Sequence, residues 1–467
     1  MIKIYMYNVK SKIENIKYLD YEILNEICYT CSYQKIGFIK EPRQFLININ
    51  NGILYTGLIP YIIQIFKKYN IQYQVMDMRN KVNKIYNWEI VNGYVLRDYQ
   101  QKIIDIVNKH SRRVFLACTS CGKSFIIANI IKEKGVKTLI IVPQISLSLQ
   151  LKEDIENALG INIGIINGDI INKDFPIIVA TPQSILNYPE ILEEVRMLIC
   201  DECHTVPSDT IYKVCCKCKN AYYRYALSGS CWRDDGTDLL LTAAFTVRDP
   251  RDSIMASELI KKGVLTPVSI TYFKCPEIYT NTNNYETIYQ INIINNEKRN
   301  NKVIALAKEH FNKNDAILIL FKNIQHGYIL YQKALDQIEN KIFIYNYKNQ
   351  KYKFHTIELV SGNTDIYTRE VIFQAIKDGL IKIMIASSVA DMGLNIPILS
   401  VLILAGGGKS STSAFQRVGR VIRKYKNKKQ AYVYDFIDMN NTLYQHSQIR
   451  YELMKLESEF KQYIISI

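Results

Sequence analysis

The sequence predicts an α/β protein with two tandem lobes, each built on a parallel sheet, and a small α/β domain before them. Two observations predict the lobes. Short apolar strands alternate with helical segments in two separate stretches, and the first stretch contains a phosphate-binding loop. Because parallel strands need crossover connections, this alternation indicates sheets covered by helices. At 467 residues, the chain has room for two or three domains.

The expected strands of the two lobes are short and mostly Ile, Val and Leu. In the first lobe they are Val114–Leu116, Thr138–Val142, Ile177–Ala180, Met197–Cys200 and Tyr225–Leu227. In the second lobe they are Ile317–Phe321, Phe343–Tyr345, Ile383–Ala386, Val401–Leu404 and Ala431–Asp435. We therefore expect residues 1–90 to form the N-terminal domain, 91–240 the first lobe, 241–300 a connection, and 301–467 the second lobe with a C-terminal helix.

Outside the lobes, the patterns are weaker. The N-terminal domain contains a helical stretch through Phe66 and an alternating strand at Gln72–Asp77. Ser253–Lys262, followed by Gly263, is typical of an amphipathic helix with a glycine stop. The Asn-rich stretch Asn281–Asn296 predicts a loop, and Tyr444–Lys461 has helical periodicity.

The phosphate-binding loop follows the strand Val114–Leu116 and precedes the helical run Phe125–Ile131. A strand, a tight loop and a helix are the context in which backbone N–H groups face phosphates. Lys123 would reach the β- and γ-phosphates, and the Ser124 hydroxyl would bind Mg²⁺. Ala117 replaces the usual first glycine and is small enough to keep the loop intact. The predicted nucleotide-binding residues of the loop are Thr119, Ser120, Cys121, Gly122, Lys123 and Ser124.

A pair of acids follows the apolar run Arg196–Cys200, which predicts a buried strand. Ligands bind at the carboxyl edge of parallel sheets, so acids at this end would face the phosphates. Asp201 would hold Mg²⁺, and Glu202 would orient and polarise the attacking water. A solvated loop with two acids is the alternative.

Further short motifs follow in order along the chain. They are Leu96-Arg97-Asp98-Tyr99-Gln100, Ile141-Val142-Pro143 with Gln150, Ala180-Thr181-Pro182-Gln183, Leu227-Ser228-Gly229-Ser230, Val360-Ser361-Gly362, Ala386-Ser387-Ser388 with Gly393, and Gln416-Arg417-Val418-Gly419-Arg420-Val421-Ile422-Arg423. With the phosphate loop and the acidic pair, this ordered set resembles the superfamily 2 helicases. In particular it resembles the phage UvsW type, which is allied to the XPB-like DNA helicases and the poxvirus transcript-release helicases. The resemblance covers essentially the whole chain.

The resemblance implies two RecA-like lobes that bind ATP with Mg²⁺ and step along a nucleic-acid strand. The implied ATP contacts outside the loop are Arg97, Gln100 and Gly393, with Gln100 recognising adenine. The implied catalytic residues are Lys123, Asp201, Glu202, Gln416, Arg420 and Arg423. Here Gln416 would sense the phosphate, and the two arginines would neutralise charge during phosphoryl transfer. Ser228 and Ser230 would couple hydrolysis to movement, although Thr-Ala-Thr or Ser-Ala-Thr is commoner at that position.

The nucleic-acid path is also inferred from the resemblance. In the first lobe it would include Pro143, Gln144, Gly168, Thr181 and Pro182. In the second lobe it would include Ser361, Gly362, Ser387 and Ser388. Hydroxyl and backbone N–H donors bind phosphates without reading bases, so little sequence specificity is expected. His326 falls at the fourth motif of the family, where an ordinary surface histidine is the alternative.

A second glycine-rich segment, Gly406-Gly407-Gly408-Lys409-Ser410, looks like a phosphate loop. The first position of that pattern would be Ile403, and no apolar helical run begins directly after Ser410. We interpret the segment as a loop beside the nucleic acid or the domain cleft.

In similar phage helicases a domain like residues 1–90 touches duplex DNA. Its phosphate contacts would be Lys67, Lys68, Arg79 and Lys81, and a purely structural cap is the alternative. The net charge of +15 suits a polyanionic partner, although an AT-rich genome would also enrich lysine.

The chain lacks a signal-peptide pattern and a long apolar run, so we expect a soluble protein in the host cytoplasm, in an infected bacterium or a viral factory, with no membrane partner. The eleven cysteines argue against a secreted disulfide framework. Cys215, Cys216 and Cys218, with Cys203 or Cys231, are a candidate zinc site, and small buried residues are the default interpretation.

The sequence thus predicts an ATP-dependent DNA helicase or translocase that remodels branched or duplex DNA in replication, recombination or repair of a phage or large DNA virus. Single-stranded DNA and the replication or recombination proteins of that virus are further expected partners. The alternatives are a transcript-release translocase, an RNA helicase, and a motor subunit that does not separate strands. The acidic motif ends in Cys203-His204 rather than the Ala-Asp of RNA-specific relatives, which favours DNA.

Overall fold

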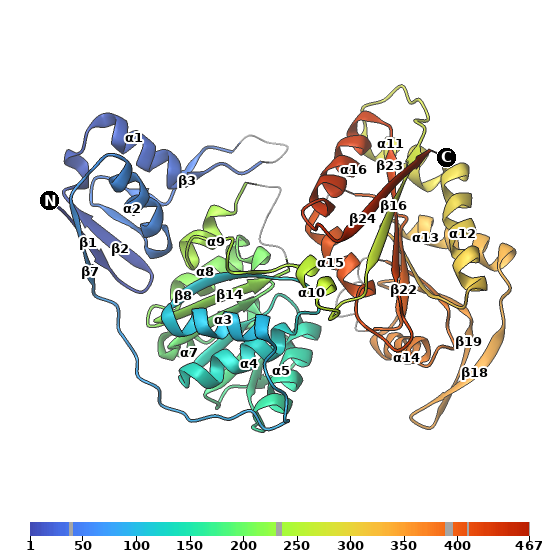
Figure 1. The fold of residues 1–467 in the computed structure, drawn as a ribbon, viewed down its shortest axis with the longest axis horizontal. Coiled ribbons are helices and arrows are strands. Elements are labelled where there is room, and N and C mark those ends of the chain that lie inside the picture. The colour runs from blue at the N-terminus through green and yellow to red at the C-terminus, as the bar shows by residue number, and fades with distance from the viewer. Residues whose placement is uncertain (37–40, 230–235, 388–395, 409–410, 467) are drawn as a thin grey trace. The chain divides into compact units, whose positions relative to one another are not determined.

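The protein is described by a computed structural model that covers residues 1–36, 41–229, 236–387, 396–408 and 411–466. The chain divides into two compact units, Met1–Ile254 and Met255–Ile467 (Figure 1). The first unit contains a five-stranded and an eight-stranded sheet, and the second a seven-stranded sheet. The predicted fold class, two parallel-sheet lobes with a small α/β domain before them, is confirmed. No helix within these residues is both long enough and apolar enough to cross a bilayer.

The N-terminal domain has a five-stranded sheet in the order β5-β6-β2-β1-β7. Its core packs Ile4, Ile13, Ile27, Ile62 and Phe66 between sheet and helices. The predicted helix ending near Phe66 and the predicted strand at 72–77 are confirmed. The elements are β1 (Ile2–Met6), β2 (Lys10–Glu14), η1 (Ile16–Tyr18), α1 (Tyr21–Thr30), β3 (Ser32–Tyr33), β4 (Gln44–Phe45), β5 (Ile47–Asn48), β6 (Ile53–Tyr55), η2 (Thr56–Leu58), α2 (Ile59–Lys68) and β7 (Tyr73–Asp77).

The N-terminal domain packs directly on the sheet that follows it. Arg112, buried at the start of β8 (Arg112–Ala117), donates hydrogen bonds to the carbonyls of Asn8 and Phe245. A methyl group at Gly57 would lie 1.9 Å from the Thr242 carbonyl oxygen, so only glycine permits this approach. The domain and the sheet therefore form one packed body.

Two of the predicted phosphate contacts of this domain are already paired. Arg79 binds the Asp77 carboxylate through Nε and Nη2 at 2.7 and 2.8 Å and donates to the Ser111 hydroxyl at 2.7 Å. Lys68 pairs with Glu26 at 2.7 Å. Arg79 therefore links the domain to the following lobe, because its guanidinium binds both Asp77 and Ser111.

The eight-stranded sheet has the order β11-β10-β12-β9-β13-β14-β8-β15, and apart from β11 its pairings are parallel. Its central strands β9 and β12 are buried along their whole length, as expected when helices cover both faces. All five predicted strands of this lobe are confirmed. The further elements are α3 (Asp98–Lys109), α4 (Lys123–Lys134), β9 (Thr138–Ile141), α5 (Ile145–Leu159), β10 (Gly164–Ile166), β11 (Ile171–Asn172), β12 (Ile177–Ala180), α6 (Pro182–Ile185), α7 (Pro189–Glu194), β13 (Met197–Asp201), η3 (Cys203–Thr205), α8 (Asp209–Lys217), β14 (Tyr223–Ser228), α9 (Leu239–Ala244) and β15 (Ser253–Ile254).

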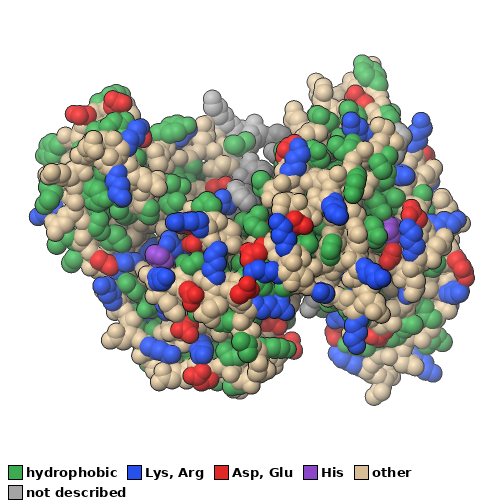
Figure 2. Space-filling model, in the orientation of Figure 1, with side chains coloured by type: hydrophobic (Ala, Val, Ile, Leu, Met, Phe, Trp, Pro, Cys, Tyr) green, Lys and Arg blue, Asp and Glu red, His purple; other side chains and the backbone are tan. Residues whose placement is uncertain are grey.

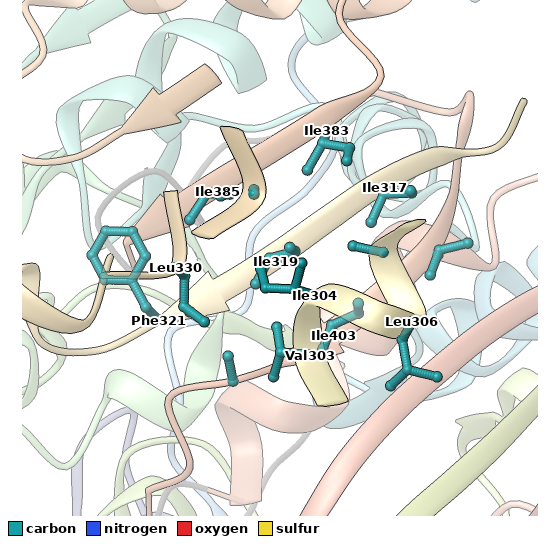
Figure 3. Packing of buried hydrophobic residues seen from close by; sticks show 14 of the residues in the cluster. Val303, Ile304, Leu306, Ile317, Ile319, Phe321, Leu330, Ile383, Ile385 and Ile403 are labelled. Atoms are coloured by element: carbon teal, nitrogen blue, oxygen red, sulfur yellow. The ribbon is translucent and has the colours of Figure 1, made fainter. Parts of the chain in front are cut away.

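The seven-stranded sheet of the second unit has the order β20-β21-β17-β22-β23-β16-β24 with parallel pairings. Its core packs Val303 and Leu330 from the helices against Ile317, Ile319 and Ile403 from the strands (Figure 3). The elements are α10 (Ala256–Lys261), β16 (Val268–Cys275), α11 (Tyr285–Tyr289), η4 (Gln290–Ile294), α12 (Glu297–Asn312), β17 (Ala316–Phe321), α13 (Ile324–Gln337), β18 (Ile342–Tyr347), β19 (Gln350–His355), β20 (Ile357–Val360), α14 (Ile366–Lys377), β21 (Ile383–Ser387), β22 (Leu399–Leu404), α15 (Ser411–Val421), β23 (Ala431–Asp438), α16 (Asn441–Met454) and β24 (Phe460–Ser466).

One predicted strand of this lobe is misplaced. Phe343–Tyr345 lies in β18, which pairs only with β19 in a two-stranded hairpin outside the main sheet. The sheet position belongs instead to β20, whose Ile357 and Val360 are fully buried. The apolar composition of 342–345 misled the prediction because alternate side chains of β18 face solvent.

The segments flanking this lobe also differ from expectation. Residues 268–275, assigned to a connection, form β16 inside the sheet. The expected loop Asn281–Asn296 is mostly helical, because Ile293 and Ile294 supply a buried face among the asparagines. The expected helix from Ser253 begins only at Ala256, and Ser253 starts β15. The expected C-terminal helix ends at Met454, and β24 then pairs with β16.

The cysteine cluster and His326 both have buried, structural surroundings. Burial raises the pKa of the Cys218 thiol to about 12, and Arg224 Nη2 donates to the Cys218 carbonyl at 2.5 Å. Within the described residues, no group of three or more His, Cys, Asp or Glu could hold a metal ion. His326 is fully buried, 2.9 Å from Asn300 Oδ1, and burial lowers its pKa to about 3. The alternative of a surface histidine is therefore wrong.

Glu358 predicts a pH dependence of stability in the second unit. Burial on β20 raises the pKa of its carboxyl group to about 7, opposed by a hydrogen bond from the His355 N–H at 2.7 Å. Because the folded pKa exceeds the unfolded value, stability falls as pH rises through the interval between them. Glu358→Gln should therefore raise the free energy of unfolding at about pH 8 by on the order of 1 kcal/mol after discounting for partial exposure, and change it little at about pH 5, as measured by thermal unfolding at the two pH values. An equal effect at both pH values would contradict this assignment.

Candidate functional site: the phosphate loop and its partners

The phosphate-binding loop joins the C-terminal end of β8 to the first turn of α4. Two of its residues adopt left-handed backbone conformations, Ser120 at φ 70° and Gly122 at φ 84°. This tight path ends at Lys123, the first residue of α4, so the free N–H groups of that helix point back over the loop. A helix N-terminus and a curled loop of this kind form an anion-binding site.

Lys123 sits against both acids of the predicted pair. Its Nζ lies 2.5 Å from Glu202 Oε1 and 3.5 Å from Asp201 Oδ1. Burial alone would lower the pKa of Lys123, but the two carboxylates outweigh burial and raise it. Burial would likewise raise the pKa of Glu202, and the Lys123 charge instead lowers it. The structure therefore holds a partly buried ammonium and carboxylate together where the sheet meets the loop.

Three neighbouring strands bring this cluster together. In the parallel sheet, β13 pairs with β14 and β14 with β8, and Asp201 is opposite Leu227 while Ser228 is opposite Leu116. Their carboxyl ends thus meet at one edge of the sheet. Glu202 follows β13 in a left-handed conformation, φ 52°, which is uncommon for a residue with a side chain and turns it toward Lys123.

The Glu202 carboxylate also connects to the next motif. Ser228 Oγ donates a hydrogen bond to Glu202 Oε2 at 3.1 Å, and His204 Nδ1 lies 2.9 Å from Ser228 Oγ. A Cβ on Gly229 would lie 3.3 Å from the Thr119 hydroxyl, so the chain after Ser228 also borders the phosphate loop. Motion of this segment would therefore alter the surroundings of Glu202.

Gln100 braces the phosphate loop from α3. Its Nε2 donates to the Cys121 carbonyl at 3.0 Å, and its Oε1 accepts from the Arg97 N–H at 3.0 Å. A Cβ on Gly122 would lie 2.6 Å from Gln100 Nε2, so the loop needs glycine there. Gln100 is buried and fixed, while the Arg97 guanidinium reaches the Tyr99 hydroxyl at 3.0 Å.

The residues predicted to hold Mg²⁺ offer the ligands that this ion prefers. Ser124 and Asp201 supply a hydroxyl and a carboxylate, and magnesium binds oxygen donors. The Lys123 ammonium beside Asp201 shows that these carboxylates stabilise a positive charge. The Ser124 hydroxyl is itself hydrogen-bonded to Asp154 on α5, a second carboxylate close to this position.

The predicted nucleic-acid residues of the first unit lie at the same sheet edge, beyond the other strands. Pro143 and Gln144 follow β9, Gly168 follows β10, and Thr181 with Pro182 follows β12. Gly168 is exposed, whereas Thr181 and Pro182 are buried, and the Thr181 hydroxyl bonds to Ser184 Oγ at 3.0 Å. The Thr181 side chain is therefore not available for direct contact with a nucleic-acid strand, whereas the exposed Gly168 is.

In the second unit, Ser361 and Ser387 lie at the ends of the paired strands β20 and β21. A Cβ on Gly362 would meet no atom within 4 Å, so this turn is open. Ser361 Oγ accepts from the Asn363 N–H at 3.3 Å, and Ser387 is mostly buried. Ser230, Ser388 and Gly393, the remaining predicted residues of these motifs, lie outside the described residues.

The predicted catalytic residues of the second unit lie on or just after α15. Gln416 and Arg420 are on the helix, and Arg423 follows it. Burial, with the nearby Arg420 charge, lowers the pKa of Arg423 to about 10. Lys428 Nζ donates to the Arg423 carbonyl at 2.9 Å and to the Leu399 carbonyl at 2.6 Å. Two arginines held close together suit an anionic ligand.

The glycine-rich segment 406–408 has a different role from the phosphate loop. The Gly406 carbonyl accepts from the Tyr289 hydroxyl at 2.5 Å, and the Gly408 carbonyl from Arg450 Nη1 at 2.6 Å. The helix that follows this segment, α15, is amphipathic rather than an apolar run, and it buries Ala414, Val418 and Val421.

Comparisons with known proteins match both units. The profile described as "Type III restriction enzyme, res subunit" matches residues 93–231, and "Helicase conserved C-terminal domain" matches residues 284–425. The "ATP-dependent DNA helicase uvsW" of Enterobacteria phage T4 is 28% identical over 71% of this chain and 66% of its own length. This chain is a superfamily 2 helicase, and it is similar to the UvsW type.

A further relative and a solved structure are also similar to this helicase. The "DNA 3'-5' translocase XPB2" of Sulfurisphaera tokodaii is 24% identical over 83% of this chain and 91% of its own length. The structure titled "ATP-dependent Type ISP restriction-modification enzyme LlaBIII bound to DNA" matches 80% of this chain and 31% of its own chain, with TM-score 0.57 and 14% identity, which shows a shared fold. The helicase is accordingly a nucleic-acid-dependent ATPase.

The sequence did not single out two residues at the site. His204 was seen only as part of the acidic motif, and its contact with Ser228 depends on β13 and β14 being neighbours. Asp154 lies within a helix that carries other charged residues, so no pattern marks it. The contacts of His204 and Asp154 become visible only from the register of the sheet and from the packing of α4 on α5.

Lys123→Ala should abolish ATP hydrolysis, because no other ammonium would contact the phosphates from the loop. Binding of nucleic acid, measured by fluorescence anisotropy, should change little. Lys132→Ala is the matched control, since Lys132 lies on the same helix and pairs with Glu89 at 3.3 Å. Hydrolysis by the Lys123 variant at the parental rate would show that the site is assigned wrongly.

Ser228→Ala should lower the rate of ATP hydrolysis about tenfold, the loss expected for one hydrogen bond to a charged group. Translocation per ATP hydrolysed should fall further, because the variant removes the hydrogen bond that Ser228 donates to Glu202. Ser253→Ala, in β15 of the same sheet, is the control. An unchanged ratio of translocation to hydrolysis would refute the coupling role.

Proposed function

We propose that this helicase uses ATP to translocate on DNA and to remodel branched or duplex DNA in the replication, recombination or repair of a phage or large DNA virus. The observation that carries the motor is the hydrogen bond between Ser228 and Glu202, which joins the predicted coupling motif to the predicted hydrolytic carboxylate. The choice of DNA is supported by the two relatives named as a DNA helicase and a DNA translocase.

The residues at the sheet edge have distinct roles in the proposed hydrolysis. The loop N–H groups and Lys123 bind the phosphates, and Lys123 exchanges its contact with Glu202 for a phosphate oxygen. Glu202, released from Lys123, orients the attacking water and accepts its proton. A bound Mg²⁺, held by Ser124 and Asp201, would neutralise phosphate charge. Arg420 and Arg423 would stabilise the charge that develops on the transferred phosphoryl group.

Movement along the strand would follow from the same contacts. Ser228 senses whether the Glu202 carboxylate is bound to Lys123 or to water, because it donates to the oxygen that does not contact Lys123. The loops after β9, β10 and β12 share this edge of the sheet with the ATP site. A shift at Glu202 is thus transmitted through a rigid sheet to the segments proposed to hold the strand.

RNA is the second candidate substrate. A relative named "Putative ATP-dependent RNA helicase L396", from Acanthamoeba polyphaga mimivirus, is 24% identical over 77% of this chain. The phosphate-binding groups proposed for the strand would accept either backbone, since none of them reads the 2′-hydroxyl.

The proposal is tested by measuring the ATPase rate at one salt concentration. The rate without nucleic acid is compared with the rates in single-stranded DNA, duplex DNA, a branched DNA junction and single-stranded RNA. We expect the branched or duplex DNA to stimulate hydrolysis most strongly. Stimulation mainly by RNA would replace the DNA assignment with the RNA helicase. Basal hydrolysis that none of the nucleic acids stimulates would favour a motor subunit that depends on a partner protein.

A further inference from the structure

The β18–β19 hairpin of the second unit is not explained by the ATP site or by the core of the sheet. It consists of two six-residue strands that pair with each other and with no strand of the main sheet. Both turn residues, Lys348 and Asn349, have positive φ, which fits the tight turn of a two-residue hairpin. The hairpin projects at the lower right of the second unit (Figure 1, orange).

The inner face of the hairpin is anchored through aromatic side chains. Tyr345 donates to Asp378 at 2.5 Å, and Tyr347 to Glu370 at 2.7 Å, so the strands are fixed to α14. Tyr352 packs against Tyr367 of the same helix with ring centroids 6.2 Å apart. Because the face is held by both hydrogen bonds and ring packing, the hairpin has a defined orientation on the second unit.

The outer face of the hairpin is exposed and positively charged. Side chains alternate along the strands, so Ile342, Ile344, Lys351 and Lys353 share the face opposite the aromatic rings. Ile344 is 67% exposed, and neither lysine forms an ion pair within the described part of the chain. The sequence from 340 to 355 contains no Asp or Glu. In Figure 2, Lys and Arg side chains lie along the lower part of this unit.

The hairpin is directly connected to a loop proposed to touch nucleic acid. His355 ends β19, β20 begins at Ile357, and Ser361 and Gly362 follow β20. The helix that anchors the aromatic face also braces this loop, because Arg369 of α14 donates to the Thr364 carbonyl at 2.9 Å. The hairpin and the loop that contains Gly362 are therefore both held by side chains of α14.

We propose that the outer face of the β18–β19 hairpin, through Lys351 and Lys353, is a nucleic-acid docking surface that binds the phosphate backbone. This inference rests on the proposed function, because it extends the strand path beyond the loop at Ser361. Two lysines spaced two residues apart on one strand lie about 7 Å apart, close to the spacing of successive phosphates in an extended strand. Ile344 beside them gives an apolar contact for a sugar or base.

Charge and shape favour nucleic acid over a protein partner. An exposed strand with unpaired lysines and no acid attracts a polyanion at long range. A protein interface would ordinarily place aromatic side chains outward, and lysine is depleted in such interfaces. Here the aromatic rings face inward on α14 and the lysines face solvent.

The test compares Lys351→Gln/Lys353→Gln with the parent in the full chain. Gln keeps the length of the side chain and removes its charge. Affinity for a fluorescent single-stranded DNA and for its duplex is measured over a range of salt concentrations. We expect roughly tenfold weaker binding at about 0.1 M salt, and a slope of log K against log salt that is shallower by about 1.4 for single-stranded or about 1.8 for duplex DNA. ATPase activity without nucleic acid should match the parent.

Lys298→Gln/Lys308→Gln is the matched control, because both residues are exposed lysines on α12 of the same unit. Lys351→Glu/Lys353→Glu should weaken binding further than the neutral variant. If the parent binds DNA and the hairpin variants bind it with the same affinity and salt slope, the docking surface is refuted and an acidic protein partner becomes the better explanation. If the parent binds no nucleic acid, the proposed function fails, and this inference fails with it.

Discussion

The contact of Lys123 with Asp201 and Glu202 is the constraint on which the rest of the site depends. It joins the end of β8, through the phosphate loop, to the end of β13. A partly buried ammonium is stabilised by opposite charge close to it, and the two acids supply that charge at this position of the sheet. Both β8 and β13 flank β14, which brings the acids to Lys123, and Glu202 turns toward it in an uncommon left-handed backbone conformation.

From this ion pair, a chain of contacts leads outward. Glu202 accepts a hydrogen bond from Ser228, and Ser228 lies beside His204. Gln100 holds the loop from the other side through the Cys121 carbonyl. Each of these contacts depends on a parallel sheet whose carboxyl ends coincide, and this arrangement concentrates polar side chains at one edge while the central strands stay apolar.

Prediction from sequence was most successful where pattern and chemistry agree. The strands of the first lobe are nearly continuous runs of Ile, Val and Leu, and each ends at a motif, so their limits were predicted well.

Prediction from sequence was less successful where apolar residues pack within a small surface element rather than in the core of a lobe. Phe343–Tyr345 looks like a core strand, but the Phe343 ring packs on Phe354 of the same hairpin and Ile344 faces solvent. In the other direction, Asn281–Asn296 looks polar, although Ile293 and Ile294 are buried. The contacts of His204 and Asp154 depend on the register of the sheet and on how the helices pack. Local sequence patterns do not determine either, so these contacts were not predicted.

The contact of Arg112 with the N-terminal domain has a mechanical consequence. Arg112 is the first residue of β8, and the same strand ends at Ala117, where the phosphate loop begins. Its guanidinium holds the Asn8 carbonyl of the N-terminal domain, and Gly57 seats that domain against the Thr242 backbone. A force applied to the N-terminal domain would therefore act on the same strand that leads into the phosphate loop.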